Sequence, residues 1–168
     1  MSNLHKQLVK KILSANKTNL IERFTSSKEL PLLLADLERH RGLSYGDLLG
    51  MGTSCIAFRK NNEVIKICSK HIKYLHHNSK SGPSDLQKRV EPLSEWLVPM
   101  KEIIFDGKEF FVYTQDICQP LDDKAVTTQV LDRILDIIQG VFASELTVGQ
   151  IKPKNVGFVN GKLCLFDY

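Results

Sequence analysis

The sequence predicts an α+β fold in which two helices precede a five-stranded antiparallel sheet. Ahead of residue 43, apolar residues recur at the spacing of a helix face. Residues 48–66 then form an apolar run, a glycine loop, a second run, a turn and a third run, which is typical of three antiparallel strands. A hairpin over residues 102–113 adds two strands. With 168 residues, 42% of them hydrophobic, the chain is long enough to bury a core.

Residues 1–42 are predicted to form a helical extension. A first helix is expected over residues 3–24, with a break near residues 16–19, because leucine and isoleucine residues there share one helix face. A second helix is expected over residues 27–41, with Gly42 as its stop signal. We expect the two helices to brace the sheet. The alternative is that they bind a partner or a membrane surface.

The glycine loop in residues 48–66 is the strongest local signal for function. Gly50 and Gly52 lie between two strands, where the absence of a Cβ lets backbone N–H groups approach phosphate oxygens. The next turn, at Asn61-Asn62, leads into a strand that carries Lys66. A lysine on a neighbouring strand can neutralise phosphate charge. A hairpin without a ligand is the alternative, but the lysine favours a phosphate-binding site.

The segment between the two groups of strands carries weaker signals. Three histidines between residues 70 and 77 have no carboxylate at ligand spacing, so we expect a solvated polar face and not a metal site. Residues 79–84 are expected to form a loop, after which Ser84 is expected to cap a helix. The hairpin at residues 102–113 is expected to turn at Asp106-Gly107.

The C-terminal part begins with a predicted helix over residues 127–146, which has a wide apolar face. A loop over residues 148–155 follows. Asn160-Gly161 is a strong signal for a two-residue hairpin turn, and this hairpin is expected to bring Asp167 back beside Asn155.

Composition and charge narrow the class of protein. The net charge of +4 is small and spread along the chain, so nucleic-acid binding is not indicated. No apolar stretch approaches the roughly 20 residues that span a bilayer, and no leader pattern is visible, so we expect a cytoplasmic protein without a membrane partner. The cysteines form no C-x-x-C pair and are expected to be reduced and mostly buried: Cys55, Cys68, Cys118 and Cys164.

The glycine loop and the lysine together resemble the N-terminal motifs of protein kinases, G-x-G-x-x-G-x-V and V-A-I-K. Here Cys55 stands at the third glycine, Ala57 stands at the valine, and residues 63–66 stand at V-A-I-K. By this resemblance, Gly50, Gly52 and Lys66 would bind the phosphates of ATP.

A second resemblance lies downstream, where residues 148–155 and 167 match the order of the kinase motifs H-R-D-x-K-P-x-N and D-F-G. It implies that Asn155 and Asp167 hold Mg²⁺ and that Lys152 is the catalytic-loop lysine. Gln150 stands where a kinase has its catalytic aspartate. An amide cannot accept a proton at neutral pH, although it can hold a hydroxyl in line.

The resemblance implies a kinase-like N-lobe over residues 43–116 and a minimal, truncated C-lobe over residues 117–168. By the same resemblance, Thr114 and Gln115 at the end of the N-lobe would form the hinge that faces adenine, and Tyr113 would lie at the back of the adenine pocket. The acid that pairs with Lys66 stays open between two candidates, because a proline follows the second: Asp85 and Glu91.

We therefore expect a regulatory, kinase-like protein that binds ATP and Mg²⁺ with weak or absent phosphotransfer. The D-F-G glycine and the activation segment have no counterpart after Asp167, which fits either a truncated protein or a fragment. The small kinase-like proteins of large DNA viruses and bacterial effectors are similar in this respect. Two alternatives stay open: an active Ser/Thr kinase, and an interaction module that binds no nucleotide and docks on a kinase or its substrate. We also expect a protein partner or self-association through the truncated C-lobe.

Overall fold

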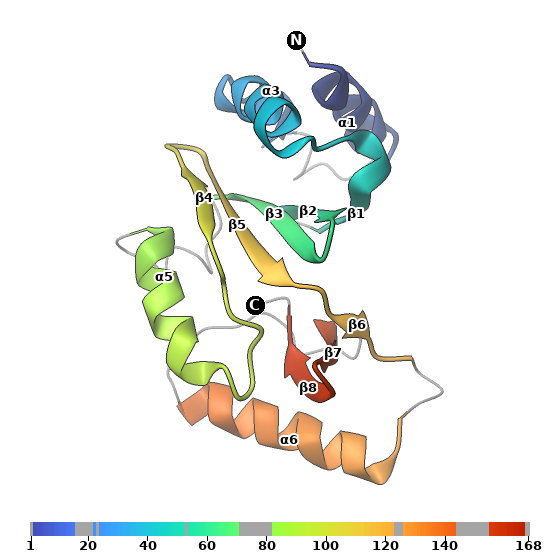
Figure 1. Ribbon diagram of the computed structural model, residues 1–168, viewed down its shortest axis with the longest axis vertical. Helices are drawn as coiled ribbons and strands as arrows, with labels where there is room; N and C mark the ends of the chain where they lie inside the picture. Colours follow the sequence, from blue (N-terminus) through green and yellow to red (C-terminus); the bar gives the residue numbers. More distant parts are fainter. Residues whose placement is uncertain are drawn as a thin grey trace. The chain divides into compact units, whose positions relative to one another are not determined.

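The computed structural model describes residues 2–15, 22, 24–52, 54–70, 82–122, 126–143 and 155–166 (Figure 1). It has the expected α+β class and contains the five-stranded antiparallel sheet. The chain forms two compact units. The first comprises Met1–Ile72 and Ile103–Thr114, and the second comprises Lys73–Glu102 and Gln115–Tyr168.

The helical extension belongs to the first unit. Helix α1 spans Asn3–Ser14, and the Ser2 side chain accepts a hydrogen bond from the His5 N–H at its start. Helix α3 spans Glu29–Arg41 and ends at Gly42, whose φ of 59° is left-handed, as expected for a helix stop. Residues 22, 24 and 25 are also helical, so the predicted helix is present on both sides of the expected break where the structure describes it, and residues 16–19 of the break lie outside the described part.

The sheet has the strand order β1-β2-β3-β5-β4. Its strands are preceded by the 3₁₀ helix η1 (Tyr45–Asp47), and their bounds are β1 Leu48–Met51, β2 Cys55–Lys60, β3 Glu63–Ser69, β4 Ile103–Asp106 and β5 Phe110–Asp116. The β2–β3 turn is the expected Asn61-Asn62 pair, because Lys60 and Glu63 are opposite each other and Asn61 has a φ of 53°. Asparagine tolerates this left-handed conformation better than most residues.

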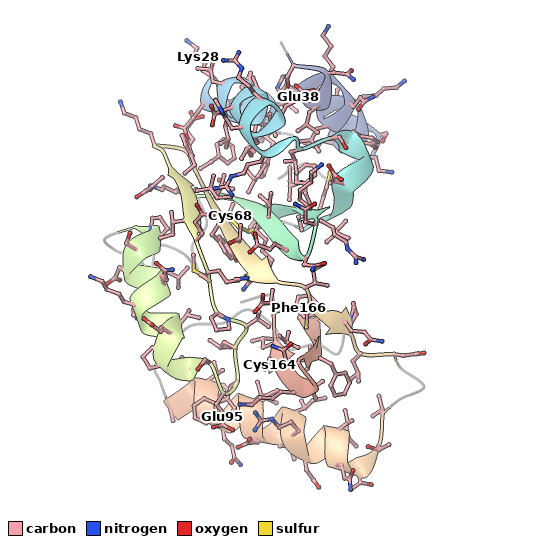
Figure 2. All side chains as sticks on the ribbon, viewed as in Figure 1. Lys28, Glu38, Cys68, Glu95, Cys164 and Phe166 are labelled. Carbon is pink, nitrogen blue, oxygen red and sulfur yellow. A yellow bond between two sulfur atoms is a disulfide. The ribbon has the colours of Figure 1, made fainter. Side chains whose placement is uncertain are left out.

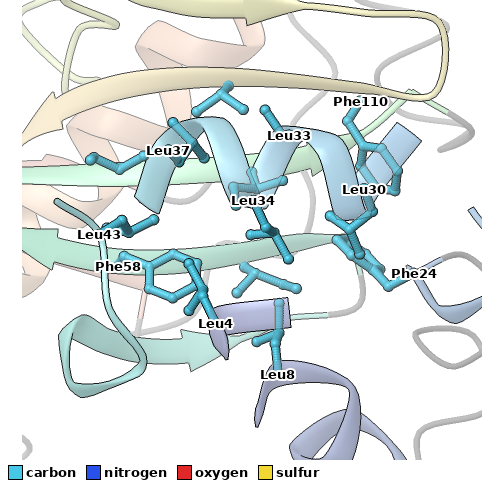
Figure 3. Packing of buried hydrophobic residues seen from close by; sticks show 14 of the residues in the cluster. Leu4, Leu8, Phe24, Leu30, Leu33, Leu34, Leu37, Leu43, Phe58 and Phe110 are labelled. Carbon is cyan, nitrogen blue, oxygen red and sulfur yellow. The ribbon is translucent and has the colours of Figure 1, made fainter. Parts of the chain in front are cut away.

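The hydrophobic core of the first unit lies between the helices and one face of the sheet (Figure 3). Leucines of α1 and α3 pack there against alternate residues of β2, β3 and β5: Ile56, Phe58, Ile65, Ile67, Phe110 and Val112. Every second residue of a strand points to the same side, so these six define one face. This packing therefore confirms that the helical extension braces the sheet.

The β4–β5 hairpin is held by helix α3 through one carboxylate. Glu29 accepts hydrogen bonds from the backbone N–H groups of residues 108–110, at 2.9, 3.2 and 3.1 Å. Ser27 accepts from the N–H groups of Glu29 and Leu30 and donates to Glu109. A Cβ on Gly107 would lie 2.1 Å from a Glu29 oxygen. The hairpin is as predicted, but its loop is longer than the expected Asp106-Gly107 turn because it wraps this carboxylate.

The second unit begins its described part with helix α5 (Pro83–Val90), which continues into the 3₁₀ helix η2 (Glu91–Leu93). Its N-cap is Gly82, with proline at the first position, and not Ser84 as expected. Residues 82–102 group with this unit.

A three-stranded sheet and a long helix make up the rest of the second unit. Strands β6 (Gln119–Pro120), β7 (Val156–Val159) and β8 (Lys162–Leu165) lie in that order. The predicted Asn160-Gly161 turn is confirmed, with φ of 50° and 78°, whereas the short strand β6 was not predicted. Helix α6 spans Thr128–Ala143 and lies against β8 and Trp96.

Candidate functional site

Lys66 lies on the face of the sheet opposite the helical core. It is directly opposite Ala57 in the β2–β3 ladder, while its neighbours Ile65 and Ile67 point into the core. Paired residues of an antiparallel ladder share a face, so Ala57 and Lys66 lie on the same side. Only 6% of the Lys66 surface is exposed. Burial of an ammonium group costs free energy unless it has favourable electrostatic contacts. A lysine as buried as Lys66 is therefore a candidate for a functional role.

Aromatic residues of β5 extend this second face. The Lys66 Nζ lies 6.0 Å from the centre of the Tyr113 ring, at the outer limit of a cation–π contact. The Tyr113 and Phe111 rings are 5.8 Å apart and nearly parallel. Both are buried, whereas Phe110 and Val112 on the same strand face the helices. The second face therefore combines a cation with two aromatic rings.

The glycine loop joins β1 to β2 beside this face. The Gly52 N–H donates to the Cys55 carbonyl at 2.8 Å, which ties Gly52 to the first residue of β2. Thr53 lies outside the described part. Neither Gly50 nor Gly52 has a positive φ. A Cβ on Gly50 would meet nothing within 4 Å, and on Gly52 it would meet only the Cys55 carbonyl at 3.5 Å. The fold itself thus does not require glycine at either position.

A disulfide joins Cys55 to Cys68, so the expectation of four reduced cysteines is wrong for these two (Figure 2). They are directly opposite in the β2–β3 ladder, with Cα atoms 4.2 Å apart. A signal was present in the sequence, since Cys55 is six residues before Asn61 and Cys68 is six residues after Asn62. Symmetry about a two-residue turn places two residues opposite each other. The disulfide lies on the same face as Lys66, two residue pairs from the Ala57–Lys66 pair.

The downstream motif lies in the second unit, and the structure describes it only in part. The Phe166 N–H donates to the Asn155 carbonyl at 2.9 Å, and Val156 is opposite Leu165. The β7–β8 hairpin thus returns the chain to Asn155 as far as Phe166. The remaining predicted residues of this motif lie outside the described part: Gln150, Lys152 and Asp167.

The expected hinge residues form the last part of strand β5. Thr114 and Gln115 are buried, at 1% and 2% exposure, and the division between the two units falls between them. The Gln115 side chain donates to the Val98 carbonyl at 2.9 Å. The hydroxyl of Thr114 is buried and has no hydrogen-bond partner within the described part of the chain. A contact with adenine stays a prediction.

The two candidate acids for Lys66 are on consecutive elements of the second unit. Asp85 lies in the first turn of α5 and is half-buried, while Glu91 is exposed in η2. Pro92 turns the helix into a 3₁₀ turn, as its ring predicts. The choice between these two acids as the partner of Lys66 stays open.

Comparisons with protein-family models and with curated proteins found no match to this chain. The kinase resemblance therefore depends on the residues named above. Across the described ranges, no three histidine, cysteine, aspartate or glutamate residues lie together as a metal site would need. No described helix combines the length and apolar character needed to cross a bilayer.

Proposed function

We propose that this chain is a kinase-like protein that binds ATP with Mg²⁺ and transfers phosphate slowly or not at all. The observation that carries the proposal is the pairing of a buried lysine with a glycine loop whose glycines the fold does not need. Glycine at such positions is explained if another molecule approaches the backbone. A phosphate group fits that role, because Lys66 supplies positive charge on the neighbouring strand.

The residues of the first unit fit the phosphate end of a nucleotide. Gly50 is exposed and leaves space where a Cβ would point, and backbone N–H groups in such a loop can donate to phosphate oxygens. Ala57 and Tyr113 offer apolar surface on the same face as Lys66. When bound, Mg²⁺ would neutralise phosphate charge, and Asn155 and Asp167 are the residues proposed to hold it.

Phosphotransfer is proposed to be weak because of Gln150. A missing general base costs on the order of a hundredfold to ten-thousandfold in rate. The loss is at the lower end if the transition state is loose, since the attacking oxygen then needs little deprotonation. An active Ser/Thr kinase is the alternative in which glutamine only orients the attacking hydroxyl.

A thermal-shift titration with Mg-ATP tests the proposal. A ligand at a hundred times its dissociation constant stabilises a protein by about 2.7 kcal/mol, so the melting temperature should rise measurably. Gly50→Ala should leave the ligand-free melting temperature nearly unchanged, because the new Cβ meets nothing, but it should weaken the response. Lys66→Met keeps the side-chain length and should abolish the response.

Two controls separate ligand binding from stability. Gly46 lies in η1 just before β1, and a Cβ there would meet only the Ser44 hydroxyl at 3.6 Å. The melting temperature of Gly46→Ala should therefore rise with Mg-ATP as much as that of the wild type. Asp167→Asn should lose mainly the dependence on Mg²⁺, because the amide removes the charge that holds the ion. A melting temperature that millimolar Mg-ATP does not move in the wild type would refute nucleotide binding.

A second candidate function, a protein-interaction module, is favoured by helix α6. Leu131, Leu135 and Phe142 are 51%, 56% and 76% exposed and follow one stripe of the helix. Ile137 and Val141, on another side of the same helix, are buried. Exposed apolar stripes often mark protein contacts. Light scattering should detect self-association that Leu135→Glu abolishes, and a compact monomer at high concentration would argue against it.

A further inference from the structure

The Cys55–Cys68 disulfide closes the open end of the β2–β3 hairpin. It joins the last residue pair of the ladder, at the end opposite the Asn61-Asn62 turn. Strand ends open more readily than strand centres, because fewer hydrogen bonds must break. A covalent link at this pair therefore acts where the hairpin is otherwise weakest.

The same link controls the C-terminal end of the glycine loop. The Cys55 carbonyl accepts from the Gly52 N–H at 2.8 Å, and the Ser54 carbonyl accepts from the Ser69 N–H at 3.0 Å. Both hydrogen bonds lie within one residue of a disulfide cysteine. If the end of the hairpin opens, both hydrogen bonds are lost and Gly52 is no longer held to Cys55.

We propose that this disulfide is a reversible redox clip that sets the order of the glycine loop. In the disulfide form the loop is fixed, and in the dithiol form it opens at its Cys55 end. Through the loop the clip also sets nucleotide affinity, a consequence that rests on the proposed ATP-binding function. A pre-ordered loop binds its ligand more tightly, because less conformational entropy is lost on binding.

The chemistry needs a dithiol reductant, of the thioredoxin or dithiothreitol class. Its thiolate attacks the Cys55 sulfur, because Cys55 is partly exposed whereas Cys68 is 1% exposed. The S–S bond breaks, and Cys68 leaves as a thiolate that takes up a proton. The second thiol of the reductant then attacks the mixed disulfide and releases Cys55. Two electrons and two protons pass to the protein, and the reductant becomes a cyclic disulfide.

The size of the effect follows from the freedom that the loop gains. Fixing the backbone of one residue costs roughly 1–2 kcal/mol. Release of about one residue's worth of freedom corresponds to a factor of about ten in an equilibrium constant. We therefore expect about tenfold faster amide exchange at Gly52 and Ser69 after reduction, and about tenfold weaker binding of Mg-ATP.

Amide hydrogen exchange on the full chain, with and without dithiothreitol, tests the proposal. Exchange at Gly52 and Ser69 should accelerate, while exchange at Phe58 and Ile65 in the middle of the ladder should change little. The double variant Cys55→Ala/Cys68→Ala should exchange rapidly with or without the reductant. Cys118→Ala lies outside the disulfide and should respond like the wild type.

Several outcomes would overturn the proposal. One is an intact mass that the reductant leaves unchanged instead of raising it by two hydrogens. Another is loop exchange that is equal in the two redox forms. Equal Mg-ATP affinity of both forms would overturn the link to the ligand and leave nucleotide binding intact. Redox-dependent loop exchange without ATP binding in either form would support the clip and refute the proposed function.

Discussion

The carboxylate of Glu29 gives the sharpest prediction about stability. It accepts three backbone hydrogen bonds from the β4–β5 loop, about 80 residues away in sequence. Hydrogen bonds to charged groups contribute about 1.5–3 kcal/mol each when buried, and less here because Glu29 is half-buried. We expect Glu29→Ala to lower the free energy of unfolding by about 2–4 kcal/mol in total.

Gly107→Ala should act through the same carboxylate. Its Cβ would lie 2.1 Å from a Glu29 oxygen and 2.5 Å from the Phe105 ring, so the carboxylate must move and release its hydrogen bonds. The two substitutions share one mechanism and should not add. In the Glu29→Ala background, Gly107→Ala should cost less than about 1 kcal/mol, because only the Phe105 contact remains to be relieved.

Urea unfolding of the wild type, the two single variants and the double variant gives this double-mutant cycle. The coupling free energy should be at least about 1 kcal/mol, which exceeds the usual error for independent sites. Glu29→Gln should be intermediate, since its amide oxygen still accepts hydrogen bonds without charge assistance. Strict additivity would show that Gly107 is required for another reason and would refute this account of the hairpin.

Three further predictions concern other parts of the chain. Burial of His5, and secondarily the nearby N-terminal charge, lower the pKa of His5 below 6.5 in the folded protein. The free energy of unfolding should therefore fall as the pH drops below 6.5, because the unfolded chain binds the proton more readily. His5→Leu should remove this pH dependence in thermal melts at pH 5–7. Gly140→Ala would place a Cβ 2.5 Å from the Trp96 indole and should cost about 1–3 kcal/mol in urea unfolding, with an altered tryptophan fluorescence spectrum. Gln150→Asp should raise transfer of radiolabelled phosphate from ATP without changing nucleotide affinity; robust wild-type transfer that requires Asp167 and falls in Gln150→Asp would contradict weak phosphotransfer.

Local features of the fold were determined by the sequence itself. Gly42 ends α3 and Asn160-Gly161 turns the β7–β8 hairpin because these residues tolerate a positive φ better than others. The apolar periodicity of residues 48–66 gave β1 to β3, since a period of two puts alternate side chains on one face. The glycine loop and Lys66 were also visible, because their spacing along one hairpin fixes their position.

The long-range contacts were decided only by the tertiary structure. The Glu29 carboxylate meets residues 108–110 because α3 packs on the sheet, and no local pattern encodes that meeting. The sequence also did not show which face of α6 is buried, because that depends on the packing of α6 against β8 and Trp96. Local conformation follows from each residue's own sterics, whereas these contacts depend on how separate elements pack.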